Sequence, residues 1–304
     1  MMNNAKKSKL KFRKMKNNSI IKVTQILLEN SKLGKSDINE IISFVIKREY
    51  SEIPFIPEYE LSTKELNKIF KISKKVAKGK PLAYILGYKI FRSHKFLTNN
   101  RTLIPRIETE QLVDYVNGFI IDNPEKKFDV LDLCTGSGCV GISLYLENSN
   151  NIEKVVLSDI SRFALKVANK NIIENKILDK VEIVRSNFMN VFLNKEQKFN
   201  ILTCNPPYID KNDANIDRDT VKYEPHLALF AKNNGLYFYE EIIKNIEKII
   251  KVDQPFIVVL EIGWQQKNNL ELLLNDKLGL KYNWIFNKDH FGNWRNLIIT
   301  NREK

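Results

Sequence analysis

The chain has 304 residues, of which 43% are hydrophobic and 28% are charged, and its formal net charge is +13. This length allows two domains with real cores, and the composition is that of a globular protein. No window approaches the ~18 uninterrupted apolar residues of a membrane span. The positive charge favours an acidic or nucleic-acid partner, but lysines spread along the chain are equally typical of a solvated surface.

The first residues, MMNNAKKSKLKFRKMK, are basic and lack acids. No apolar segment follows them, so we expect a solvated tail rather than a secretory signal, with an organelle-targeting role as the alternative. The three cysteines, Cys134, Cys139 and Cys204, show no C-x-x-C spacing, and only three histidines accompany them. We therefore expect no metal site, and scattered thiols fit a reducing compartment such as the cytoplasm.

The first part of the chain has helical periodicity. Apolar residues recur every three or four positions in TQILLEN, INEIISFVIKREY and STKELNKIFKISKKVAKG. Ser62 followed three residues later by Glu65 is a helix-start signal. We predict a small helical domain over residues 1–80. Aromatic and β-branched residues then predict a β-hairpin linker over residues 81–104.

Strands alternate with helices from residue 105 onward. The segments FDVLDL, EKVVLSD, VEIVRS, FNILTC and FIVVLEI are apolar on both faces, with helical segments between strands. This alternation predicts an α/β fold with a mostly parallel sheet covered by helices on both faces. FNILTC should lie beside FDVLDL in a doubly wound, Rossmann-like sheet. The last two strands, around LKYNWIF and WRNLIIT, leave no room for a crossover helix, so they should form an antiparallel edge hairpin.

A Gly-rich loop, LDLCTGSGCVG, joins the first of these strands to a helix. Gly136, Gly138 and Gly141 match G-x-G-x-x-G, a weak dinucleotide signature, and they allow a ligand close to the backbone. Asp159, at the end of the second strand, lies where an acid binds a ribose. NAD(P) and S-adenosylmethionine both fit this pattern. Asp132 favours the second, because a carboxylate there would repel a pyrophosphate and suit the cationic methionine end of the nucleoside. Helix capping by the two acids is the structural alternative.

Asn205-Pro206-Pro207-Tyr208 follows FNILTC at the carboxyl end of its strand. The two prolines end the strand and stiffen the chain. The Asn205 side-chain oxygen and the Pro206 carbonyl could accept both N–H bonds of a planar amino group, with the Tyr208 ring packed on it. Two such hydrogen bonds net only ~0.5–1.5 kcal/mol each, whereas orientation can supply ~7–11 kcal/mol, so the turn should act by positioning. A merely structural turn is the alternative.

Six segments carry a family resemblance: PLAYILGYKIFRSHKFLTNNRTLIPRIETEQLVD, LDLCTGSGCVGISL, NPPYI, YEPHLALFAKNNGLYFYEEII, LEIGWQQ and DHFGNWRNLII. In order and spacing they resemble the protein-(glutamine-N5) methyltransferases of the PrmC/HemK type, over roughly residues 75–300. The resemblance implies a Rossmann-like class I methyltransferase that uses S-adenosylmethionine. It also implies an N-terminal helical substrate-recognition domain, residues 1–80, and a methyltransferase domain, residues 105–304.

The resemblance further implies methylation of the glutamine in the Gly-Gly-Gln motif of peptide chain release factors. That glutamine would be bound by Asn205, Pro206, Pro207 and Tyr208, and Asn205, Pro206 and Tyr208 would serve catalysis. The implied cofactor-binding residues are Cys134, Thr135, Gly136, Ser137, Gly138, Asp159, Asn187, Phe188 and Asn205. Among them Asp159 would bind the ribose and Phe188 would pack on the adenine.

Three positions depart from the family pattern. Cys134 lies where glycine is usual, Asn187 replaces an acid, and Ile107 replaces the proline of R-P-E-T-E. For the segment 106–110 the alternative is an ordinary helix start with ion pairs. The segment 224–226, Glu-Pro-His, could supply a catalytic acid–histidine pair, but we expect it to anchor a loop.

Two other functions compete with this interpretation. The net charge favours an amino methyltransferase acting on adenine or guanine in DNA or RNA, although no added target-recognition domain is evident. A non-enzymatic RNA- or ribosome-associated protein could keep the fold as a scaffold, but it would not bind S-adenosylmethionine. We expect a monomeric, cytoplasmic enzyme that acts on release factors, with no membrane association and no direct nucleic-acid substrate.

Overall fold

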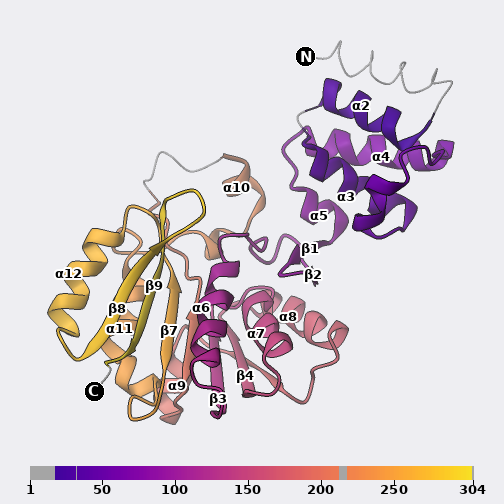
Figure 1. The fold of residues 1–304 in the computed structure, drawn as a ribbon. Coiled ribbons are helices and arrows are strands. Elements are labelled where there is room, and N and C mark those ends of the chain that lie inside the picture. Colours follow the sequence, from indigo (N-terminus) through magenta and orange to yellow (C-terminus); the bar gives the residue numbers. More distant parts are fainter. Residues whose placement is uncertain (1–17, 32, 212–217, 303–304) are drawn as a thin grey trace. The chain divides into compact units, whose positions relative to one another are not determined.

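The computed structural model describes residues 18–31, 33–211 and 218–302, so the predictions about the basic tail lie outside the described residues. The chain divides into two compact units, Met1–Gly87 and Tyr88–Lys304 (Figure 1). No helix in the described part of the chain is long and apolar enough to cross a membrane.

The N-terminal unit is helical. Its elements are α2 (Ile20–Asn30), α3 (Lys35–Ile46), the 3-10 helix η1 (Tyr50–Phe55), α4 (Thr63–Val76) and α5 (Leu82–Leu86). Each long helix buries one apolar stripe: Ile38, Ile41, Ile42 and Val45 of α3 are all buried.

Ser62 begins α4 as predicted. The Glu65 N–H donates to Ser62 Oγ at 3.3 Å, and the Ser62 N–H donates to the Glu65 carboxylate at 2.8 Å. This reciprocal capping satisfies two N–H groups that the first helical turn would otherwise leave free. The helix-start signal is therefore confirmed.

The predicted hairpin is shorter than its composition suggests. Its strands are β1 (Tyr88–Phe91) and β2 (His94–Leu97), which pair antiparallel. Residues Leu82–Leu86 form α5 instead, so expecting a hairpin from residue 81 was wrong at that end. The helix buries Ala83 and Leu86 and ends at Gly87, whose left-handed backbone (φ 87°) glycine adopts at little cost.

A seven-stranded sheet forms the centre of the second unit. Its strands are β3 (Phe128–Leu133), β4 (Ile152–Asp159), β5 (Val181–Arg185), β6 (Ile201–Cys204), β7 (Ile257–Glu261), β8 (Tyr282–Lys288) and β9 (Trp294–Asn301). Their order is β5-β4-β3-β6-β7-β9-β8. The first five strands in this order are parallel, and β9 is antiparallel to both β7 and β8. The predicted parallel sheet, its β3–β6 neighbours and its antiparallel edge are confirmed.

Helices cover both faces of this sheet (Figure 1). One face packs against α6 (Glu110–Ile121), α7 (Cys139–Glu147) and α8 (Arg162–Glu174), and the other against α9 (Asn190–Lys195), α11 (Tyr237–Ile249) and α12 (Lys267–Lys277). Val130 of β3 packs in the core between the sheet and α6, α7 and α8, whereas its neighbour Leu131 packs in the core on the opposite face. The strands are apolar at successive positions because both faces are buried.

The order of the strands fixes where a ligand can bind. β3 has β4 on one side and β6 on the other, so the chain leaves the carboxyl ends of β3 and β6 in different directions. A crevice opens at such a switch point in doubly wound sheets. The Gly-rich loop follows β3 and the Asn-Pro-Pro-Tyr turn follows β6, so both predicted sites lie at this crevice.

Gly141 of α7 should be intolerant of a side chain, because an added Cβ would lie 2.4 Å from Leu157 Cδ2 and 3.1 Å from Asp132 Cβ. We predict that Gly141→Ala destabilises the protein by ~1–3 kcal/mol through overpacking. The matched control is Gly118→Ala on α6, where an added Cβ meets no atom within 4 Å, and which should stabilise by ~0.5–1 kcal/mol. Thermal unfolding of both variants measures the difference, and equal midpoints would contradict the packing argument.

Candidate active site

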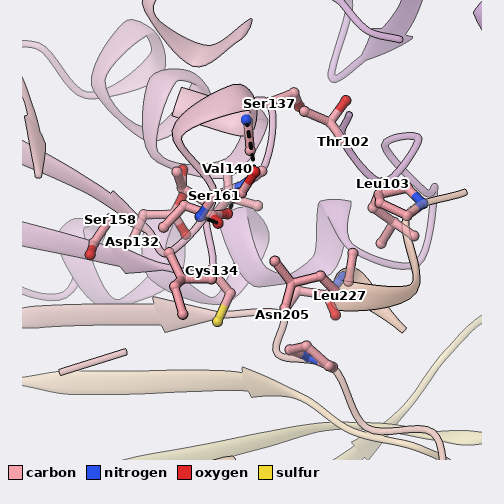
Figure 2. A pocket seen from close by; sticks show the side chains of 18 of the residues that line it. Thr102, Leu103, Asp132, Cys134, Ser137, Val140, Ser158, Ser161, Asn205 and Leu227 are labelled. Atoms are coloured by element: carbon pink, nitrogen blue, oxygen red, sulfur yellow. Dashed lines mark hydrogen bonds between the residues drawn. The ribbon is translucent and has the colours of Figure 1, made fainter. Parts of the chain in front are cut away.

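A cavity of about 270 Å³ lies at the carboxyl ends of β3, β4 and β6. Of the predicted site residues it is lined by Cys134, Thr135, Gly136, Ser137, Asp159, Asn187, Phe188, Asn205 and Pro207. In Figure 2, Asp132, Cys134 and Ser158 lie to one side of the cavity, with Asn205 and Leu227 to the other. Gly138, Pro206 and Tyr208 are not among its lining residues.

Gly138 serves packing rather than the wall of the cavity. It is the residue before α7 and has a left-handed backbone, φ 83°. A Cβ there would lie 2.9 Å from Ile142 Cδ1 and 3.1 Å from Leu157 Cδ1. The glycine thus lets the loop pass close to β4, which places the neighbouring lining residues.

Asp132 is a buried carboxylate at the end of β3. It accepts hydrogen bonds from Thr135 Oγ1 at 2.5 Å, from the Gly141 N–H at 3.2 Å and from Thr203 Oγ1 at 2.9 Å. Burial raises the pKa of Asp132 to about 6, although the three donors oppose that rise. The carboxylate therefore fixes the loop, the start of α7 and β6 against one another.

Asp159 ends β4 on the same wall. Its carboxylate accepts from the Gly136 N–H at 3.0 Å and from the Ser161 N–H at 2.8 Å. Burial raises the pKa of Asp159 above its usual value. Among the described residues no lysine, arginine or histidine forms an ion pair with Asp132 or Asp159. Two carboxylates without an ion-pair partner, both beside the Gly-rich loop, favour a cationic ligand at that part of the cavity, whose lining also includes Arg101 and the Glu224-paired Arg106.

Asn171 of α8 attaches the Gly-rich loop to the β1–β2 hairpin. This fully buried amide donates to the carbonyls of Ser137, at 2.8 Å, and Leu97, at 3.1 Å, and it accepts from the Leu97 N–H at 2.7 Å. Its donors and acceptor are thus satisfied, which makes the contact specific. Sequence reasoning missed this residue, since a polar residue within an amphipathic helix gives no distinct signal.

Two lining residues have left-handed backbones that side chains rarely adopt. They are Cys134 (φ 56°) and Phe188 (φ 53°). At the position of Cys134 the family that this sequence resembles usually has glycine, which adopts this conformation without strain. The Phe188 ring contacts Phe238 edge to face, with centroids 4.8 Å apart, and both rings line the cavity. Phe238 was not predicted to belong to the site.

The Tyr208 side chain and backbone are both held from outside the turn. Its hydroxyl donates to Glu261 Oε1 at 3.3 Å and accepts from Arg295 Nη1 at 3.4 Å. Its carbonyl accepts from Gln266 Nε2 at 2.9 Å. Burial and the charge of Glu261 raise the pKa of Tyr208 above its ordinary value, so the hydroxyl stays protonated and can donate.

Asn205 is held by residues that the sequence did not single out for this role. Its Nδ2 donates to Thr109 Oγ1 at 3.1 Å, and the Thr109 hydroxyl donates to Glu261 Oε2 at 2.6 Å. Thr109 belongs to the turn of residues 107–109, which directly precedes α6 and leaves Ile107 exposed at 61%. Ile107 stands where the family pattern has proline, and with isoleucine at this position Thr109 still lies beside the Asn205 amide.

The segment 224–226 anchors a loop, as predicted. The Glu224 carboxylate is buried, accepts from the Ile104 N–H at 3.0 Å and forms an ion pair with Arg106. His226 Nε2 hydrogen-bonds the Val221 carbonyl at 2.9 Å. Glu224 thus fixes the cavity wall formed by Ile104 and Arg106.

Comparisons with known proteins agree with this fold. The family description "Methyltransferase small domain" matches residues 109–222. Among solved structures, the human Mettl16 catalytic domain in complex with MAT2A 3′UTR hairpin 6 superposes with a TM-score of 0.50 at 13% identity, over 77% of this chain and 92% of that one. At this identity the likeness concerns the fold alone. Fold and site define a Rossmann-like class I methyltransferase.

The chain is 45% identical to a release factor glutamine methyltransferase from Mycoplasma mycoides, over 94% of this chain and 99% of that protein. It is 38% identical to a protein of the same name from Leptospira interrogans, over 74% of this chain and 76% of that protein. The chain belongs to the release factor glutamine methyltransferase family.

Removal of the Glu224 carboxylate should loosen the wall that it anchors. We predict that in Glu224→Ala the amide of Ile104 exchanges hydrogen at least about tenfold faster, because its buried acceptor is lost and the segment opens locally. In Arg106→Gln the ion pair is lost but the Ile104–Glu224 hydrogen bond is kept, so exchange should change less. Hydrogen-exchange mass spectrometry of peptides covering residues 101–107 measures both, and equal protection in Glu224→Ala and wild type would refute the anchoring role.

Proposed function

We propose that this protein methylates the side-chain amide nitrogen (N5) of the glutamine in the Gly-Gly-Gln motif of a peptide chain release factor, with S-adenosylmethionine as methyl donor. The similarity that carries this proposal is the 45% identity to a release factor glutamine methyltransferase over 94% of the chain. The Asn205–Tyr208 turn, at the carboxyl end of β6, would supply the hydrogen-bond acceptors and the aromatic ring that such a reaction needs to orient the substrate amide.

The cavity suits the cofactor by the charge of its walls. Asp132 and Asp159 form no ion pair in the described part of the chain, while of the two arginines that also line the cavity Arg106 pairs with Glu224 and Arg101 lies over the Phe163 ring. The two carboxylates beside the Gly-rich loop favour a sulfonium nucleoside there over a pyrophosphate. In this proposal the loop Cys134–Gly138 holds the methionine part, and Asp159 accepts from the ribose hydroxyls. Asn187 and Phe188 would border the adenine.

When bound, S-adenosylmethionine supplies a methyl group that is electrophilic enough for a weak nucleophile. The chain's own residues then have to aim the substrate amide. The Asn205 Oδ1 and the Pro206 carbonyl would accept the two amide N–H bonds, Pro207 would stiffen the turn, and the Tyr208 ring would pack against the amide plane. Positioning of this kind is worth up to ~7–11 kcal/mol.

A strong general base is not needed for this step. No histidine, lysine or glutamate occurs among the described residues that line the cavity, and the two lining aspartates, Asp132 and Asp159, already accept hydrogen bonds from the loop and its neighbours. The amide nitrogen would become acidic as its bond to the methyl carbon forms and the methyl–sulfur bond breaks, so that a neutral thioether leaves and solvent can take the proton. The site is therefore suited to orientation rather than to deprotonation.

We infer that the N-terminal helical domain, which we place at residues 1–80, contributes to recognition of the release factor, with residues 81–104 as the linker to the methyltransferase domain at residues 105–304. We further infer that the enzyme is a cytoplasmic monomer with no direct nucleic-acid substrate.

Transfer of a labelled methyl group tests the substrate. The protein is incubated with labelled S-adenosylmethionine and either a release factor, its Gly-Gly-Gln→Gly-Gly-Ala variant, or total RNA and DNA. Label should enter the wild-type release factor alone, and Asn205→Ala should lower turnover by at least about 100-fold while cofactor affinity by calorimetry changes little. Label in nucleic acid but not in the release factor would refute the proposal in favour of a base methyltransferase.

Cofactor affinity should depend on pH through Asp132. The pKa of about 6 means that at pH 8 the carboxylate is charged and attracts the cationic cofactor, whereas at pH 5 about a tenth of the molecules keep that charge. We predict that the dissociation constant of S-adenosylmethionine rises up to about tenfold between pH 8 and pH 5. Calorimetry at the two pH values measures the change.

The control for this prediction is Asp132→Asn. Its carbonyl can still accept from Thr135 and Gly141 while its amide donates to Thr203, so the local contacts survive without the charge. The variant should bind more weakly at pH 8 and lose most of the pH dependence. An unchanged slope would assign the dependence to another group, such as Asp159.

A further inference from the structure

A buried chain of hydrogen bonds links Asn205 to a carboxylate that lies outside the cavity. Thr109, exposed by 3%, stands between Asn205 Nδ2, at 3.1 Å, and Glu261 Oε2, at 2.6 Å. Glu261 ends β7 and is likewise exposed by only 3%. Packing does not require a hydroxyl and a carboxylate at these two buried positions. Aliphatic side chains would fill the same space without the free-energy cost of burying polar groups.

The direction of each hydrogen bond between Asn205, Thr109 and Glu261 follows from which atoms can donate and which can only accept. An ionised carboxylate only accepts hydrogen bonds, so the Thr109 proton must point to Glu261. The Thr109 oxygen then has only lone pairs left for Asn205, which must present its N–H2 group to it. The Asn205 oxygen is therefore turned away from Thr109, and among the described residues none donates a hydrogen bond to it.

Glu261 holds the other functional side chain of the turn at the same time. Its second oxygen accepts from the Tyr208 hydroxyl at 3.3 Å. Burial raises the pKa of Glu261 above its ordinary value, and the positive charge of Arg295, which donates to Tyr208 at 3.4 Å and to the buried Asp289 at 3.1 Å, opposes that rise and favours the ionised carboxylate. One carboxylate thus sets both the first and the last residue of the Asn-Pro-Pro-Tyr turn.

We propose that Thr109 and Glu261 are positioning residues for methyl transfer, because together they select the Asn205 rotamer whose oxygen faces the substrate amide. The inference rests on the proposed function. An Asn205 amide turned by 180° would oppose its N–H2 group to the N–H2 group of the substrate, and two donors repel. Loss of the Thr109 hydroxyl therefore misorients the acceptor without removing it.

Thr109→Val removes the hydroxyl and keeps the shape. It should lower kcat about 10- to 100-fold at saturating release factor and S-adenosylmethionine, since a buried polar group loses its partner. Cofactor affinity by calorimetry should stay within about threefold, and Thr109→Ser should restore most of kcat. Tyr282→Phe is the matched control, because it likewise removes a hydroxyl that donates to a glutamate, here Glu247 at 3.1 Å and outside the cavity, and it should leave kcat unchanged.

Glu261→Gln tests the direction of these hydrogen bonds independently. It also decides whether the two residues position Asn205 if Thr109→Val does not fold. Its amide can donate to Thr109, which then turns its own proton toward Asn205 and favours the wrong rotamer, so kcat should again fall about tenfold or more. Near wild-type kcat in a folded Thr109→Val or in Glu261→Gln overturns this inference alone. An inactive wild type on release factors overturns the proposed function instead.

Discussion

The carboxylate of Asp132, held between two neighbouring parallel strands, is the contact on which the geometry of the site depends. It lies one residue before the end of β3, accepts from Thr203 of β6, and also accepts from Thr135 and from Gly141 at the start of α7. One buried group thus ties the Gly-rich loop to the strand that leads into Asn205. Reacting atoms must approach to about 3–3.5 Å in the right direction, so donor and acceptor sites have to be rigid relative to each other. Adjacent strands at a topological switch point provide that rigidity.

Segments far apart in the sequence converge on the Asn-Pro-Pro-Tyr turn. Its Tyr208 carbonyl accepts from Gln266, and a Cβ on Gly235 would lie 2.1 Å from the same carbonyl oxygen. Arg295 reaches the Tyr208 hydroxyl from β9. The segments LEIGWQQ, KNNG and GNWRN therefore all help to hold this turn in place. The two prolines only stiffen its backbone.

Continuous apolar strands and their alternation with helices sufficed to predict the sheet, its switch point and its antiparallel edge, because burial on both faces makes successive residues of a strand apolar. The loop and turn residues at that crevice could be predicted for the same reason. The contact of Asn205 with Thr109 spans 96 residues and that of Thr109 with Glu261 spans 152. No local pattern encodes such pairings, and they follow only from the completed sheet. The helix α5 was missed because five residues are too few for a helical period to appear.

A turn fixed in this way constrains where substrate selectivity can lie. Its acceptors suit any planar amino group, whether of a glutamine or of a nucleobase, and its buried anchors leave it no freedom to adapt. Discrimination must then come from the walls around it, such as the Ile104–Arg106 segment held by Glu224 and the adjoining Leu227, which is 57% exposed. These residues contact neither Glu261 nor Thr109 by any hydrogen bond in the described part of the chain. Substitutions in the walls can therefore change which substrate enters while the turn keeps its orientation, whereas substitutions in the turn's anchors lower turnover for every substrate alike.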